Sequence, residues 1–96
     1  MRAIIMGAGQ MGRAIAYGLN KLGHSVAVAD IHSKSLEAVS GNNFALIHTK
    51  DYGDDRSFLK EYDVVVSALP YHQNWRLAQY CIDNGLRYCD LGGSVP

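Results

Sequence analysis

The sequence is poor in cysteine and in long apolar runs. Cys81 and Cys89 are its only cysteines, too few for the disulfide framework of a small secreted domain or for a four-cysteine zinc site. We expect two reduced and mostly buried thiols. No stretch approaches the roughly 18 apolar residues that a membrane-spanning helix needs. Gly7 and Gly9 interrupt the apolar start too early for a signal peptide. These absences predict a soluble, cytoplasmic protein without a membrane partner.

The sequence also lacks an excess of charge of either sign. Nine basic and nine acidic residues cancel, and the pI is about 6.9. A nucleic-acid-binding protein usually carries a basic patch, so we expect no nucleic-acid partner. The hydrophobic fraction of 48% is that of a globular chain, and 96 residues suffice for one domain.

What the chain does contain is a repeated switch between strand-like and helix-like segments. The predicted strands are 2–7, 25–30, 44–49, 63–70 and 87–93, and the predicted helices are 10–22, 33–40, 55–62 and 74–85. A serine is available to cap the second helix, and Trp75, Ala78 and Ile82 share one face of the last. Strands that alternate with helices imply a doubly wound, parallel α/β sheet of the Rossmann type. We predict the order 3-2-1-4-5, without the sixth strand of a complete sheet. Residues 1–96 would form a dinucleotide-binding domain.

The turn after the first predicted strand matches the pattern G-x-G-x-x-G. Its residues are Gly7, Ala8, Gly9, Gln10, Met11 and Gly12. The pattern follows a strand and opens a helix, which is the context of a dinucleotide site. The first glycine permits the tight turn, the second lets a pyrophosphate approach the backbone, and the third lets the helix pack closely. A glycine turn without a ligand is the alternative interpretation.

The choice of cofactor depends on Asp30, which ends the second predicted strand 23 residues after Gly7 (30 − 7). A carboxylate there can accept hydrogen bonds from the adenosine ribose, and its charge would repel a 2′-phosphate. We therefore expect NAD, with Asp30 and Ile31 in the cofactor site. NADP remains possible, because His32 and Lys34 could receive a 2′-phosphate if the acid turned away.

The second half of the chain resembles the saccharopine dehydrogenase family, which includes lysine 6-dehydrogenase. The resemblance rests on "DVVVSALP" (63–70), Asn74 and "GLRYCDLGG" (85–93), and extends over essentially all 96 residues. It implies an NAD(P)-dependent oxidoreductase that transfers hydride between a nicotinamide cofactor and a C–N bond of an amino acid. An amino-acid substrate would then bind through a further domain, and this chain alone would bind nucleotide without turnover.

The resemblance also implies roles for particular residues. Ala68, Leu69 and Pro70 would lie along the cofactor toward the nicotinamide, and Asp51 would lie near the adenine. From its position alone, Asp90 ends the fifth predicted strand, where a carboxylate could meet a substrate ammonium or act in a proton relay. Capping of the following turn is its alternative role. We expect these 96 residues to be the N-terminal part of a longer protein, so the fifth strand would form an open sheet edge, and a homodimer through that edge would be an artefact of truncation.

A second function class is a nucleotide-sensing regulatory module. The first thirty residues also resemble the regulatory domains of potassium channels. Those domains lack the pairing of "SALP" with "YCDLGG". The second half of the chain therefore favours the dehydrogenase interpretation.

Overall fold

A computed structural model describes residues 1–39, 44–49, 57–69 and 71–90, with the side chains of residues 71–74 excepted. The elements are β1 (Arg2–Met6), α1 (Gln10–Lys21), β2 (Ser25–Asp30), α2 (Ser33–Glu37), β3 (Ala45–His48), the 3₁₀ helix η1 (Ser57–Glu61), β4 (Val64–Ser67), α3 (Tyr71–Asp83) and β5 (Arg87–Asp90). Each strand forms where the sequence predicts one, although most are shorter than expected.

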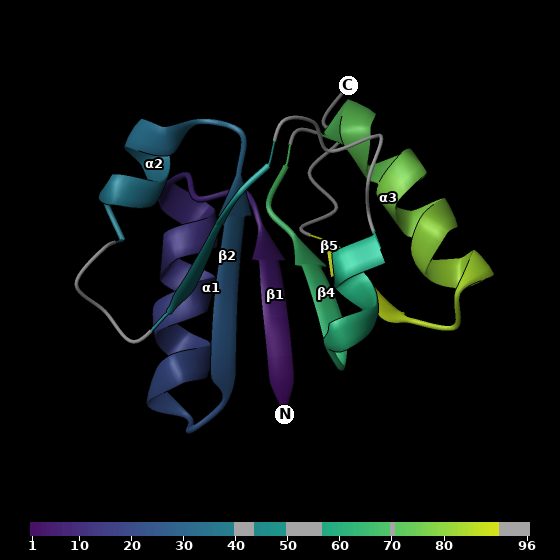
Figure 1. The fold of residues 1–96 in the computed structure, drawn as a ribbon, viewed down its shortest axis with the longest axis horizontal. Coiled ribbons are helices and arrows are strands. Elements are labelled where there is room, and N and C mark those ends of the chain that lie inside the picture. Colours follow the sequence, from purple (N-terminus) through teal and green to yellow (C-terminus); the bar gives the residue numbers. More distant parts are fainter. Residues whose placement is uncertain (40–43, 50–56, 70, 91–96) are drawn as a thin grey trace.

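The strands pair in parallel in the order β3-β2-β1-β4-β5. The predicted doubly wound fold and strand order are confirmed. Ile4 of β1 lies opposite Ala27 of β2 and Val65 of β4, at the centre of the sheet. Figure 1 shows helices on both sides of the sheet, as right-handed crossovers require.

Side chains that alternate along the strands build two apolar clusters, one on each face of the sheet. Ile5 joins the cluster under α1 and α2, where Ala16 and Leu36 are buried. Its neighbour Ile4 joins the cluster under η1 and α3, where Leu59 and Leu77 are buried. Because successive strand residues point to opposite faces, a strand buried on both sides needs a continuous apolar run, which β1 has.

The helices differ from the prediction in three details. His32, not a serine, is the N-cap of α2, and its side chain makes no capping hydrogen bond. Within the segment predicted as a third helix, Ser57–Glu61 forms the 3₁₀ helix η1. In α3 the shared face of Trp75 and Ile82 is the exposed one, with Leu77 among the core residues instead.

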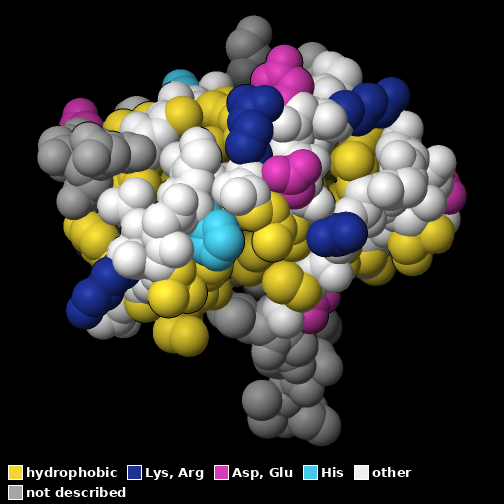
Figure 2. All heavy atoms as spheres, turned by 90° about the horizontal axis from the view of Figure 1, so that it is seen from below, with side chains coloured by type: hydrophobic (Ala, Val, Ile, Leu, Met, Phe, Trp, Pro, Cys, Tyr) yellow, Lys and Arg dark blue, Asp and Glu magenta, His cyan; other side chains and the backbone are white. Residues whose placement is uncertain are grey.

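Cys81 is buried as expected, whereas Cys89 is exposed, because it lies on the edge strand β5. Among the described helices, none combines the length and apolar character needed to cross a membrane. Figure 2 shows the face at the amino ends of the strands, where basic and acidic side chains are interspersed over the described part.

Candidate dinucleotide-binding site

The turn between β1 and α1 requires glycine at position 7. Gly7 has a φ of +107°, in the left-handed region that side chains disfavour. Its N–H donates a hydrogen bond of 2.7 Å to the carbonyl oxygen of Ala29 on β2. A Cβ added at Gly7 would lie 3.2 Å from the carbonyl oxygen of Ala68, so the space is also restricted. The turn therefore sits tightly against the ends of β2 and β4.

The space around Gly12 is closely packed, whereas the space around Gly9 is open. A Cβ at Gly12 would lie 1.9 Å from the carbonyl oxygen of Gly7, which means that α1 packs directly on the turn. A Cβ at Gly9 would meet nothing within 4 Å. Gly9 is the N-cap of α1, makes no side-chain capping bond, and precedes a first turn without acidic residues. The exposed N–H groups of a helix start, with its positive dipole end, suit a phosphate in this open space.

Asp30 has a structural role that was not predicted from the sequence. Its Oδ2 accepts a hydrogen bond of 2.7 Å from the N–H of Ala8, and its Oδ1 accepts one of 2.8 Å from the N–H of His32. The side chain is only 4% exposed. The carboxylate thus ties the glycine turn to the start of the β2–α2 connection. The carboxylate is thus turned toward the protein, which is the orientation that the NADP alternative requires. A contact between Asp30 and a ribose stays a prediction.

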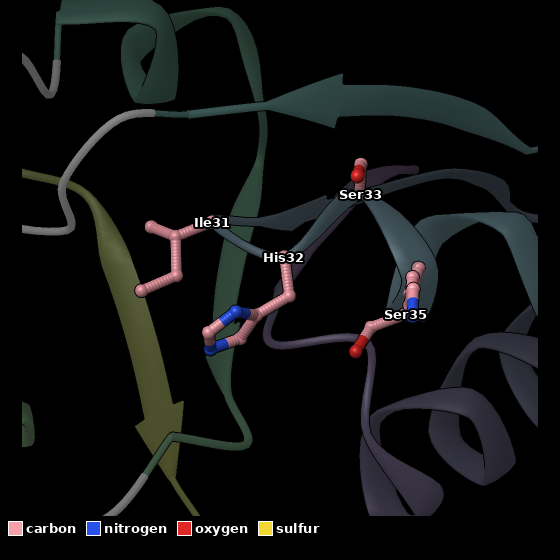
Figure 3. A pocket seen from close by; sticks show the side chains of 5 residues that line it. Ile31, His32, Ser33 and Ser35 are labelled. Carbon is pink, nitrogen blue, oxygen red and sulfur yellow. The ribbon is translucent and has the colours of Figure 1, made fainter.

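Beyond Asp30, the connection to α2 and the first residues of α2 line a pocket of about 560 Å³. Its lining residues are Ile31, His32, Ser33, Lys34 and Ser35. In Figure 3 the side chains of Ile31, His32 and Ser35 point to the same side of the connection, whereas Ser33 points away from them. An imidazole, an ammonium group and serine hydroxyls are hydrogen-bond donors of the kind that bind phosphate.

Two of the predicted nicotinamide-side residues lie beside the glycine turn. Ala68 donates its N–H to the carbonyl oxygen of Met6 over 2.8 Å, which continues the β1–β4 pairing past the end of β4. Leu69 follows, and its N–H donates to Oγ of Ser67 over 3.3 Å. Both Ala68 and Leu69 are half-buried. Pro70 and Asp51 lie outside the described residues.

Asp90 lies at the carboxyl end of β5 and has a tyrosine as its partner. The O–H of Tyr88 donates a hydrogen bond of 3.0 Å to Oδ2 of Asp90. Asp90 is exposed, and it lies opposite Ser67 of the neighbouring strand β4. Burial, the hydrogen bond to Asp90 and the charge of Asp90 raise the pKa of Tyr88, against a smaller opposing effect of the Ser67 hydroxyl. Tyr88 therefore stays a neutral donor that fixes one oxygen of this carboxylate.

Tyr88 was not predicted as a site residue, although the sequence contained a signal for it. Residues two apart on a strand point to the same face, so Tyr88 and Asp90 had to be neighbours once β5 was assigned. No group of three or more metal-ligating side chains occurs among the residues that the structure describes. The glycine turn, the pocket beside α2 and the carboxylate of Asp90 all lie at the carboxyl ends of the parallel strands, which is where such sheets bind ligands.

Comparison with known proteins decides the family. The family model described as "Saccharopine dehydrogenase NADP binding domain" matches residues 3–95. The chain belongs to this family. It is a nicotinamide-dinucleotide-binding domain of the saccharopine dehydrogenase type, and the resemblance seen in the sequence is confirmed. The family match gives no support to the alternative of a potassium-channel-like regulatory module.

Solved structures share the fold of this saccharopine dehydrogenase-type domain. Apo histidine-tagged saccharopine dehydrogenase (L-Glu forming) from Saccharomyces cerevisiae matches with a TM-score of 0.76 and 19% identity, over 99% of this chain and 22% of that one. A protein from Arthrobacter sp. FB24 assigned as an F420-dependent NADP-reductase matches with a TM-score of 0.60 and 19% identity, over 98% of this chain and 49% of that one. The chain thus spans about a fifth to a half of the length of these proteins.

Proposed function

We propose that this domain binds NADP, with the 2′-phosphate in the pocket beside α2. The expectation of NAD depended on repulsion by Asp30. The carboxylate of Asp30 instead accepts two backbone N–H groups and is almost fully buried. A 2′-phosphate beyond it would meet the side chains of His32 and Lys34, which line the pocket. The inward orientation of Asp30 carries this proposal, and the NADP named in the family description supports it.

The rest of the dinucleotide would extend across the ends of the strands. The pyrophosphate would sit in the open space at Gly9, against the N–H groups at the start of α1. Ile31 would lie beside the adenosine, on the same connection as the phosphate pocket. Ala68 and Leu69 would flank the nicotinamide half. This path follows the rule that ligands bind outside the carboxyl ends of parallel strands.

For the whole protein we infer an oxidoreductase that acts on a C–N bond of an amino acid. NADP, when bound, would supply hydride transfer to or from the carbon that carries the nitrogen. Asp90, whose carboxylate is held by Tyr88, would accept a hydrogen bond from the substrate nitrogen or take its proton. The substrate would be bound largely by residues outside this domain.

The cofactor proposal is tested by two small nucleotides that differ in one group. We expect 2′,5′-ADP to bind at least about tenfold more tightly than 5′-AMP, because a charge-assisted hydrogen bond contributes about 1.5–3 kcal/mol. Isothermal titration calorimetry measures both affinities. Equal affinities would contradict a 2′-phosphate site. Because both ligands contain the same adenosine, the comparison does not depend on how tightly the domain binds that part.

A further inference from the structure

The outer face of α3 carries large apolar side chains that the domain leaves in water. Leu77 and Cys81 point into the core and are 1% and 0% exposed. On the opposite side, Trp75 is 65% exposed and Ile82 is 72% exposed. Burying such side chains is favourable by about 1.5–3 kcal/mol each, so their exposure on one helix face points to an interaction surface.

Two pairs of residues on this face have the same spacing. Trp75 and Ile82 are seven residues apart, and so are Arg76 and Asp83. Seven residues make almost two helical turns, so each pair lies along one stripe of the helix, about 10 Å apart. The guanidinium of Arg76 lies 5.4 Å from the ring centre of Trp75, which places the two stripes side by side.

The same face of α3 carries a shallow groove of about 220 Å³. Its lining residues are Trp75, Arg76, Gln79, Tyr80 and Asp83. Gln79 is exposed near the midpoint of both pairs, and its side-chain amide donates a hydrogen bond of 2.9 Å to Oδ1 of Asp83. The face is therefore apolar along one stripe, oppositely charged at the two ends of the next, and hollowed between them.

We propose that a second copy of this chain docks on this face, with the two α3 helices antiparallel and a two-fold axis beside Gln79. A two-fold axis perpendicular to the helix reverses its direction but keeps each stripe opposite its own copy. Arg76 then meets the partner's Asp83, and Trp75 meets the partner's Ile82. Each contact occurs twice, as in any isologous interface.

A second copy explains the surface better than an unrelated partner does, because the complementary groups are both present within one helix. The chain has no net charge, so two copies do not repel each other at long range. The helix has 13 residues and is about 20 Å long. Its face is smaller than the roughly 800 Å² per partner of a standard interface, so we expect a weak dimer with a micromolar dissociation constant. This surface is distinct from the β5 edge that the sequence suggested.

Tryptophan fluorescence and sedimentation test the proposal together. Trp75 is the only tryptophan of the chain, so its emission reports on this face alone. Between about 1 µM and about 1 mM protein, we expect a monomer–dimer equilibrium in the ultracentrifuge and a parallel shift of the emission to shorter wavelength. Leu22→Ala, at a 75% exposed position that follows α1, is the matched control and leaves both signals unchanged. A monomer throughout this range, or a dimer without an emission shift, overturns the proposal.

Charge reversal tests the register of the two helices. Arg76→Asp would place a carboxylate against the partner's Asp83 twice, and we expect the dissociation constant to rise at least about tenfold. Adding Asp83→Arg restores opposite charges, and the double variant should return to within about threefold of the original value. A dimer that is unaffected by Arg76→Asp, or that the double variant fails to restore, contradicts the antiparallel arrangement.

Discussion

The N–H of Ala8 donates a hydrogen bond of 2.7 Å to Oδ2 of Asp30, across 22 residues of sequence. This bond joins the glycine turn to the end of β2. A second hydrogen bond, from the N–H of His32, holds the other carboxylate oxygen, so Asp30 has a structural role in this turn. The acid therefore supports the turn at which we propose that the pyrophosphate binds, and the side chains of His32 and Lys34 line the pocket next to it.

Asp30→Asn should destabilise the domain. The amide places an NH₂ group where one of the two backbone N–H donors now finds an oxygen, and an unsatisfied buried donor costs about 1–3 kcal/mol. Urea denaturation measures the change in the free energy of unfolding. Glu61→Gln, at an exposed position of η1, should change it by less than about 0.5 kcal/mol. A stability of Asp30→Asn equal to the wild type would show that these bonds contribute nothing.

The glycines at positions 9 and 12 should separate binding from folding. Gly9→Val meets open space in the protein and should leave stability nearly unchanged while it abolishes dinucleotide binding. Gly12→Ala forces a methyl group onto the carbonyl oxygen of Gly7 and should cost about 3 kcal/mol or more. Thermal unfolding and calorimetric titration of both variants provide the measurement. Retained binding by a folded Gly9→Val protein would place the nucleotide elsewhere.

Tyr88 should make the domain sensitive to alkaline pH. Its pKa is raised in the folded state, mainly by burial, so its contribution to stability is complete below the unfolded value of about 10 and is lost as pH rises above it. The urea midpoint should therefore fall more between about pH 8 and about pH 11 for the wild type than for Tyr88→Phe. Tyr17→Phe, at an exposed ring of α1, should keep the full wild-type loss. An equal loss in Tyr88→Phe and wild type would contradict the assignment.

The sequence was sufficient for the topology because the topology depends on pattern. Apolar runs such as that of β1, separated by helical segments, allow only a handful of parallel arrangements, and the glycine motif after β1 favours the order 3-2-1-4-5 among them. The orientation of Asp30 was beyond prediction, because it depends on which donors the folded turn brings within reach of the carboxylate. The exposed face of α3 was equally hidden, since Trp75 and Leu77 are both apolar and only the packing decides which one is buried.

The proposed preference for NADP is tested most directly by the ratio of the dissociation constants for NADH and NADPH, measured by calorimetry on this chain. We predict that NADPH binds at least about tenfold more tightly, and that Lys34→Ala brings the ratio close to one without weakening NADH. Lys21→Ala, which removes an exposed ammonium at the far end of α1, should leave the ratio unchanged. NADH binding that equals or exceeds that of NADPH would contradict the account. So would a ratio that Lys34→Ala leaves unchanged.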